Sequence, residues 1–166
     1  QIARNLGCNV YGTAGGADKC AFLEKEFGIT AIDYKSENVE ERLAQIEGGI
    51  DVYFDNVGGP QIDAVFPNMA NYGRIAISGL IAEYSGQPTQ PARFDQILMK
   101  RLTVKGFFSP DFADQGARLT EALKEQYVAG KLDMPFDVTD GLDNMLTAYT
   151  KLFTGGNIGK TLVKLF

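Results

Sequence analysis

The 166-residue sequence has no histidine and no tryptophan, and it contains only two cysteines. Without histidine, and with cysteines that show no paired spacing, the chain lacks the usual ligand sets for zinc. It also lacks an apolar run of the roughly eighteen residues that a membrane-spanning helix requires, and its start has no signal-peptide pattern. These absences argue against a disulfide framework, a metal site and a membrane span. A soluble, cytoplasmic protein is therefore expected.

Basic residues are too few to make the surface positive overall. Lysine and arginine number 16 against 21 aspartates and glutamates, which gives a net charge of −5. This balance argues against binding to nucleic acid or to an anionic membrane, and an anionic ligand would need a local basic site. The 45% of hydrophobic residues can bury the core of one domain. A small-molecule substrate is the expected partner, and a homodimer is left open.

Short apolar segments alternate with helical patterns along most of the chain. Because parallel neighbouring strands need crossover helices, this order predicts an α/β fold with a Rossmann-like, doubly wound parallel sheet. Ser36 is expected to cap the helix before the third strand, and that strand is apolar enough to be covered on both faces. The predicted strands lie near residues 9–13, 31–33, 51–56, 74–78 and 103–108.

Ligands of doubly wound sheets bind outside the carboxyl ends of the strands. That rule selects the residues that follow each predicted strand as candidates for a binding site. They are residues 13–19, Tyr34, residues 55–59, residues 78–84 and residues 106–109.

Five stretches match a known family in their order and close to its spacing: "GTAGGADK", "IDYK", "DVYFDNVGG", "RIAISGLIAEY" and "NIGKTLVKLF". With them the chain resembles the zinc-independent branch of the medium-chain dehydrogenase/reductases. Within that branch it is similar to the leukotriene hydroxydehydrogenase, prostaglandin reductase and alkenal double-bond reductase group.

The resemblance implies a division into two parts. Residues 1–129 would form a dinucleotide-binding domain, and residues 130–166 would be a C-terminal segment that returns to the catalytic domain. The family's amino-terminal catalytic domain, first strand and glycine-rich loop have no counterpart here, so the chain is expected to be a fragment. Because that first strand is central in the usual order, we expect the five strands not to form one unbroken sheet.

The first predicted strand does not end in an acid. An acid there would bind the adenosine ribose hydroxyls and repel a 2′-phosphate. Instead, Gly15 and its small neighbours leave space and free backbone N–H groups at a helix start, which favours an anion. Lys19 can reach the same spot, Tyr34 can close its other side, and the family places phosphate-binding residues at both positions. The implied cofactor is NADP(H). The alternative is that Lys19 is a solvated surface lysine and that Asp18 is the relevant group.

Other residues after the predicted strands suit the rest of the cofactor. The amide of Asn56, beside glycines, can bond the ribose or nicotinamide side, although an ordinary asparagine turn is the alternative. Gly79 belongs to the same strand-end group. Phe107 and Ser109, with Phe108 between them, could wall the nicotinamide, although aromatic pairs at strand ends are more often core. By the family analogy Asn157 contacts the cofactor; otherwise it is a turn residue.

Tyr84 is the candidate for chemistry. In the reductase group a tyrosine at the matching position lies near the reacting carbonyl oxygen, and a phenol can donate a hydrogen bond or a proton to an enolate. The alternative is an exposed loop tyrosine. The resemblance thus implies NADPH-dependent reduction of the C=C bond of α,β-unsaturated aldehydes or ketones. A quinone reductase, a protein that binds NADPH without turnover and, more remotely, a methyltransferase-like domain are the alternatives.

Overall fold

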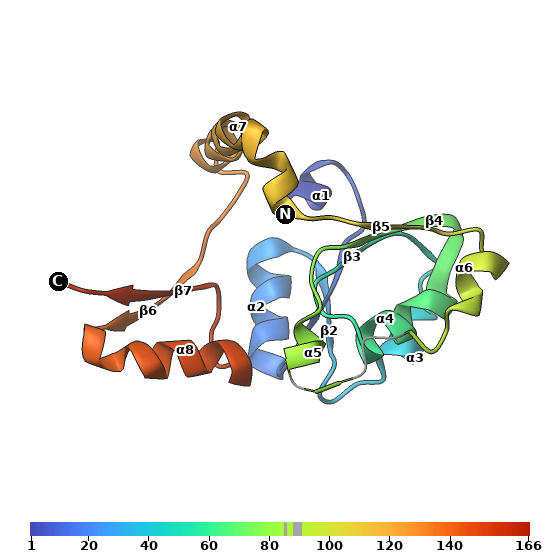
Figure 1. The fold of residues 1–166 in the computed structure, drawn as a ribbon, viewed down its shortest axis with the longest axis horizontal. Coiled ribbons are helices and arrows are strands. Elements are labelled where there is room, and N and C mark those ends of the chain that lie inside the picture. Colours follow the sequence, from blue (N-terminus) through green and yellow to red (C-terminus); the bar gives the residue numbers. More distant parts are fainter. Residues whose placement is uncertain (85, 88–90) are drawn as a thin grey trace. The chain divides into compact units, whose positions relative to one another are not determined.

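The computed structural model describes residues 1–84, 86–87 and 91–166. Its contacts divide the chain into two compact units, one made of residues 1–33 and 117–166 and the other of residues 34–116. Figure 1 shows the helices and strands of both units. The functional boundary after residue 129 stays a prediction.

The amino-terminal part of the first unit is a parallel strand pair with a crossover helix. It consists of α1 (Ile2–Asn5), β1 (Tyr11–Ala14), α2 (Ala17–Phe27) and β2 (Thr30–Asp33). Strands β1 and β2 pair in parallel, and the register sets Ala14 opposite Asp33. Helix α2 ends at Gly28 in the left-handed conformation, with φ of 60°, which glycine adopts readily. The two strand ends and the start of α2 therefore lie at one edge of this sheet.

The carboxyl-terminal part of the first unit repeats this strand–helix–strand pattern. It contains α7 (Gly116–Val128), β6 (Phe136–Asp140), the 3-10 helix η3 (Leu142–Asn144), α8 (Met145–Thr154) and β7 (Lys160–Lys164). Strands β6 and β7 pair in parallel. Helix α8 packs against β7 and lies along the strand pair (Figure 1). The chain after residue 129 therefore forms a second strand–helix–strand element.

The second unit is built on the three-stranded parallel sheet β3-β4-β5. Its strands are β3 (Ile50–Asp55), β4 (Met69–Ile77) and β5 (Thr103–Gly106), and its helices are α3 (Val39–Leu43), α4 (Pro60–Val65), η1 (Phe66–Asn68), α5 (Ile81–Tyr84), α6 (Asp95–Met99) and η2 (Ser109–Gln115). All five predicted strands are present, and the α/β class with parallel strands is confirmed. As expected, these five strands belong to two sheets and not to one unbroken sheet.

The two faces of the three-stranded sheet differ. One face is buried, with Asp55 and Ile75 at 0% and 2% exposure and Ile62 of α4 at 2%. On the other face Val52 and Phe54 are 55% and 56% exposed. The expectation that β3 is covered on both faces is therefore wrong for this unit. The reason is that α3 and α4 lie on the same side of the sheet (Figure 1).

Helix α3 is capped by Asn38 and not, as predicted, by Ser36. The Asn38 side chain accepts a hydrogen bond from the backbone N–H of Glu41 at 3.3 Å, and its amide donates to the Glu41 carboxylate at 3.0 Å. This reciprocal pair satisfies an N–H group that a helix start leaves free. The helix consequently begins at Val39, later than the pattern suggested.

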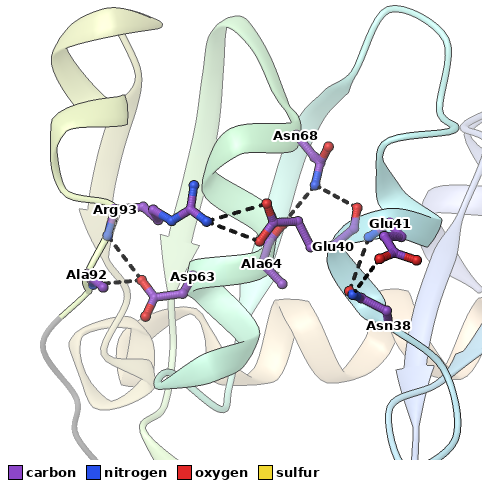
Figure 2. Close-up of polar contacts among 8 residues, drawn as sticks. All are labelled: Asn38, Glu40, Glu41, Asp63, Ala64, Asn68, Ala92 and Arg93. Carbon is purple, nitrogen blue, oxygen red and sulfur yellow. Dashed lines mark hydrogen bonds and ion pairs between the residues drawn. The ribbon is translucent and has the colours of Figure 1, made fainter.

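A polar network joins α3, α4 and the segment before α6 (Figure 2). The Asp63 carboxylate accepts from the backbone N–H groups of Ala92 at 2.7 Å and Arg93 at 3.3 Å. The Arg93 guanidinium pairs with Glu40 at 3.4 Å. Asn68 donates to the carbonyl oxygen of Glu40 at 3.1 Å. The network fixes the start of α6 on the helices that cover the sheet.

Candidate functional site

Asp33 caps the start of α2. One of its carboxylate oxygens accepts the backbone N–H of Gly16 at 2.8 Å, and the residue is only 8% exposed. The N–H of Gly16 is therefore not free for a ligand, which corrects the expectation drawn from the glycines. The sequence reasoning missed this contact, although an acid at the end of a strand beside β1 was the available signal.

Lys19 lies in the first turn of α2 and is half-buried. Its Nζ is near the end of α8, because a methyl group at Gly155 would come within 3.6 Å of it. Gly155 is the left-handed C-cap of α8. A helix C-terminus attracts a cation, so the end of α8 stabilises the Lys19 ammonium group where it lies. Lys19 is thus partly exposed, and its role in cofactor binding stays a prediction.

The other two residues predicted at this end of the cofactor lie at strand ends. Gly15 follows β1 and is half-buried. Tyr34 follows β2 directly and is 46% exposed. Because β1 and β2 are paired parallel strands, both residues continue from the same edge of one sheet.

Asp55 organises the turn after β3. The residue is fully buried, and its Oδ1 accepts hydrogen bonds from the backbone N–H groups of Val57 at 2.9 Å and Gly58 at 3.0 Å. The Tyr53 hydroxyl donates to the same oxygen at 3.1 Å. Burial, and then the Asp55 charge, raise the pKa of Tyr53 well above its usual value, so the hydroxyl stays protonated. Asp55 therefore satisfies backbone donors of the turn that follows it.

The turn after β3 is joined by backbone hydrogen bonds to the loop after β4. The carbonyl oxygen of Asp55 accepts from Ser78 N–H at 2.7 Å, and those of Asn56 and Val57 accept from Ile81 at 3.1 Å and Ala82 at 2.9 Å. These bonds bring Asn56 and Gly79 together, as the strand-end rule predicts. They also fix the start of α5, whose last residue is Tyr84.

The side chains around this joint are open to a ligand. Asn56 is exposed, and Tyr84 is 80% exposed at the end of α5. Phe107 is 39% exposed and stacks on Phe112 with a centroid distance of 5.0 Å. The aromatic residues after β5 are therefore not core residues. Ser109, also exposed, begins η2.

Asn157 lies in the turn before β7 and is half-buried. Its amide donates to the carbonyl oxygen of Gly159 at 2.9 Å. This contact agrees with the turn alternative for Asn157. Its role in cofactor binding stays a prediction.

No metal cluster and no membrane helix are found in the part of the chain that the structure describes. In residues 1–84, 86–87 and 91–166, no three histidine, cysteine, aspartate or glutamate side chains are grouped to hold a metal ion. Over the same ranges no helix combines the length and apolar content needed to cross a bilayer.

The chain is similar to known oxidoreductases along almost its whole length. It is 39% identical over 167 residues to the NADP(+)-dependent 2-alkenal reductase of Nicotiana tabacum, covering 98% of this chain and 49% of that protein. Prostaglandin reductase 1 of Bos taurus is 38% identical over 171 residues, covering 99% and 51%. The chain therefore spans about half the length of the curated relatives it matches.

Solved structures and a family profile agree with these relatives. CurA of Vibrio vulnificus, solved in complex with NADPH, superposes with a TM-score of 0.89 at 34% identity, covering 99% of this chain and 52% of that one. The profile of the zinc-binding dehydrogenase family matches residues 1–149. The chain thus belongs to the zinc-binding dehydrogenase family, among the medium-chain dehydrogenase/reductases that its sequence resembles.

Proposed function

We propose that the protein carrying this chain is an NADPH-dependent oxidoreductase that reduces the C=C bond of α,β-unsaturated aldehydes and ketones. The observation that carries the proposal is the similarity over nearly the whole chain to the tobacco 2-alkenal reductase. Two further relatives support the cofactor: the NADPH-dependent curcumin reductase of Escherichia coli, at 34% identity, and the NADPH complex of CurA.

Lys19 is the cation that would meet the 2′-phosphate of NADPH. It is half-buried in the first turn of α2, where the helix dipole favours an anion. Because the Gly16 N–H is engaged by Asp33, the phosphate charge would fall mainly on Lys19, with the Tyr34 hydroxyl as a second donor. Gly15, directly after β1, would bring no side chain against the ribose.

Asn56 would hold the nicotinamide end of the cofactor. Its exposed amide stands at the start of the turn that Asp55 fixes, and the absence of a side chain at Gly79 lets the neighbouring loop lie close to Asn56. Phe107 and Ser109 follow β5 in the same unit and would line the ring. Asn157 would contact the cofactor from the turn before β7.

Tyr84 is the proposed catalytic residue. When bound, NADPH supplies the hydride that adds to the β-carbon of the substrate. Negative charge then develops on the carbonyl oxygen as an enolate forms, and the phenol of Tyr84 donates a hydrogen bond to that oxygen. Tyr84 is 80% exposed at the end of α5, which leaves its hydroxyl accessible to a substrate.

The test uses the full protein that carries these 166 residues. NADPH oxidation is measured with a panel of enones and quinones, and NADPH and NADH are compared as cofactors. We expect enones to be turned over faster than quinones, and NADPH to be preferred. Faster turnover of quinones would favour a quinone reductase, and NADPH binding without any turnover would favour a non-catalytic protein.

The proposal also covers zinc, location and assembly. We expect turnover to persist after treatment with a metal chelator, since these 166 residues supply no histidine for zinc and resemble the zinc-independent branch of the family. Activity that is lost on chelation and restored by zinc would contradict this. A cytoplasmic location and a homodimer belong to the proposal as well, and fractionation and sedimentation analysis test them.

A further inference from the structure

We propose that Asp55 is a positioning residue, whose buried carboxylate holds the turn that presents Asn56 and, through that turn, the loop that leads to Tyr84. This inference rests on the proposed function, because Asn56 and Tyr84 are the groups assigned there to the cofactor and the substrate. Asp55 itself is not assigned a contact with the cofactor or with the substrate.

The carboxylate is bonded to the backbone that carries Asn56. Its Oδ1 receives the N–H groups of Val57 and Gly58, at 2.9 and 3.0 Å, and so closes the turn directly after Asn56. Backbone N–H bonds to a carboxylate are charge-assisted and stronger than neutral ones. The residue is fully buried, so water does not compete for these bonds. The direction of the Asn56 side chain therefore depends on one buried oxygen atom.

The same turn is also hydrogen-bonded to the neighbouring loop after β4, and so fixes where that loop lies. The carbonyl oxygens of Asn56 and Val57 accept the N–H groups of Ile81 and Ala82, the first residues of α5. A turn that moves when the carboxylate is lost would shift or release these bonds. Helix α5 has only four residues, so its placement depends on such contacts.

The second carboxylate oxygen supports a role beyond packing. Within the described ranges, Oδ2 of Asp55 is buried and has no hydrogen-bond partner. A buried oxygen of this kind costs free energy. An asparagine would keep the acceptor for Val57 and Gly58 but would bury amide donors at the site of Oδ2. A carboxylate therefore suits this position, because Oδ1 accepts several hydrogen bonds and the side chain buries no N–H group that would need an acceptor.

Asp63 offers a matched control. Its carboxylate also accepts two backbone N–H groups, those of Ala92 and Arg93, but it does so in the network before α6 (Figure 2). Asp63→Asn therefore weakens the same kind of contact in the same unit. No residue assigned to the cofactor or the substrate takes part in that network.

The experiment compares Asp55→Ala, Asp55→Asn and Asp63→Asn in the full protein. Thermal stability is measured, together with KM for NADPH and with kcat for an enone, the latter calculated per folded protein. We expect Asp55→Ala to raise KM and to lower kcat by roughly tenfold each, with partial rescue in Asp55→Asn. Asp63→Asn should lower the melting temperature but leave both constants unchanged. Wild-type constants in both Asp55 variants would overturn the proposal.

A second measurement separates this proposal from the proposed function. If the wild-type protein neither binds NADPH nor reduces enones, the proposed function fails. Backbone amide exchange then tests whether Asp55 holds the turn and the loop after β4. In Asp55→Asn, we expect faster exchange at Val57 and Gly58 and also at Ile81 and Ala82. Unchanged exchange at Ile81 and Ala82 would overturn the claim that Asp55 positions the second loop. This readout also serves if Asp55→Ala does not fold.

Discussion

Gly79 lies directly against Asn56: a methyl group at residue 79 would come within 3.0 Å of the Asn56 carbonyl oxygen. That oxygen cannot move away freely, because it also accepts the N–H of Ile81. We therefore expect Gly79→Ala to destabilise the fold by about 1–3 kcal/mol, the usual cost of overpacking. The measurement is chemical denaturation of the full protein.

Gly106 is the matched control for this prediction. It ends β5 in the same unit, and a methyl group there would meet no atom within 4 Å. Gly106→Ala should therefore be neutral or stabilise the protein by up to about 1 kcal/mol, by restricting the unfolded chain. Equal stabilities for the two variants would contradict the close approach of residues 56 and 79.

Replacing Lys19 should weaken NADPH binding far more than NADH binding. A hydrogen bond to a charged group contributes roughly 1.5–3 kcal/mol, so Lys19→Ala should raise the Kd of NADPH by roughly ten- to a hundredfold. NADH carries no phosphate at this position, and its Kd should barely change. Calorimetric titration of both cofactors measures the ratio, and added salt should shrink the effect.

Tyr34→Phe tests the second donor of the same site. Its hydroxyl is neutral, so we expect a smaller loss of NADPH affinity than for Lys19→Ala and again no change for NADH. Equal losses of both cofactors in both variants would mean that the two residues only support the fold. The assignment of a phosphate site would then fail.

Tyr84→Phe should lower the turnover of enones and leave the Kd of NADPH nearly unchanged. The substitution removes the hydroxyl but keeps the ring at the end of α5, so the loop itself is not disturbed. Loss of a donor to a developing oxyanion costs roughly a hundredfold or more in kcat. Steady-state kinetics per folded protein provide the check, and wild-type turnover would identify Tyr84 as an ordinary exposed tyrosine.

The half-buried Tyr53 should make the fold sensitive to alkaline pH. Burial and Asp55 raise its pKa in the folded state, whereas the unfolded chain ionises near the ordinary tyrosine value of about 10. The stabilisation is therefore fully present below pH 10. Above it, the unfolded state loses a proton that the folded state keeps, and stability falls by about 1.4 kcal/mol per pH unit from this residue.

Comparison with Tyr53→Phe isolates this effect. The variant should be less stable at neutral pH, because it lacks the hydrogen bond to Asp55. Above pH 10 its stability should fall less steeply than that of the wild type. Parallel curves of unfolding free energy against pH would show that Tyr53 ionises equally in both states.

Local signals in the sequence were sufficient to predict much of the fold. The end of α2 at Gly28 and the start of α4 at Pro60 follow from the backbone preferences of these two residues. The positions of the strands follow from apolar runs between such signals. The residues after the strands were found by the general rule for parallel sheets, which is why Asn56 and Gly79 were predicted together.

The pattern of apolar and turn residues could not predict contacts between residues that are distant in the sequence. Asp33 engages Gly16 only because the register of β1 and β2 brings them together, and that register is not visible in either segment alone. The cap at Asn38 is different, because Glu41 stands only three residues further along and is a local signal that was overlooked. The exposure of Val52 and Phe54 depends on which side of the sheet the helices take.

The bond between Asp33 and Gly16 also limits how coenzyme preference could be redesigned. The direct route to an NADH-dependent variant is to end β1 in an acid, as in Ala14→Asp. Residue 14 is the register partner of Asp33, so the new carboxylate would stand beside a nearly buried one on the adjacent strand. Relieving that repulsion by neutralising Asp33 would weaken the cap of α2. An engineer would therefore have to rebuild the strand end and the helix start together.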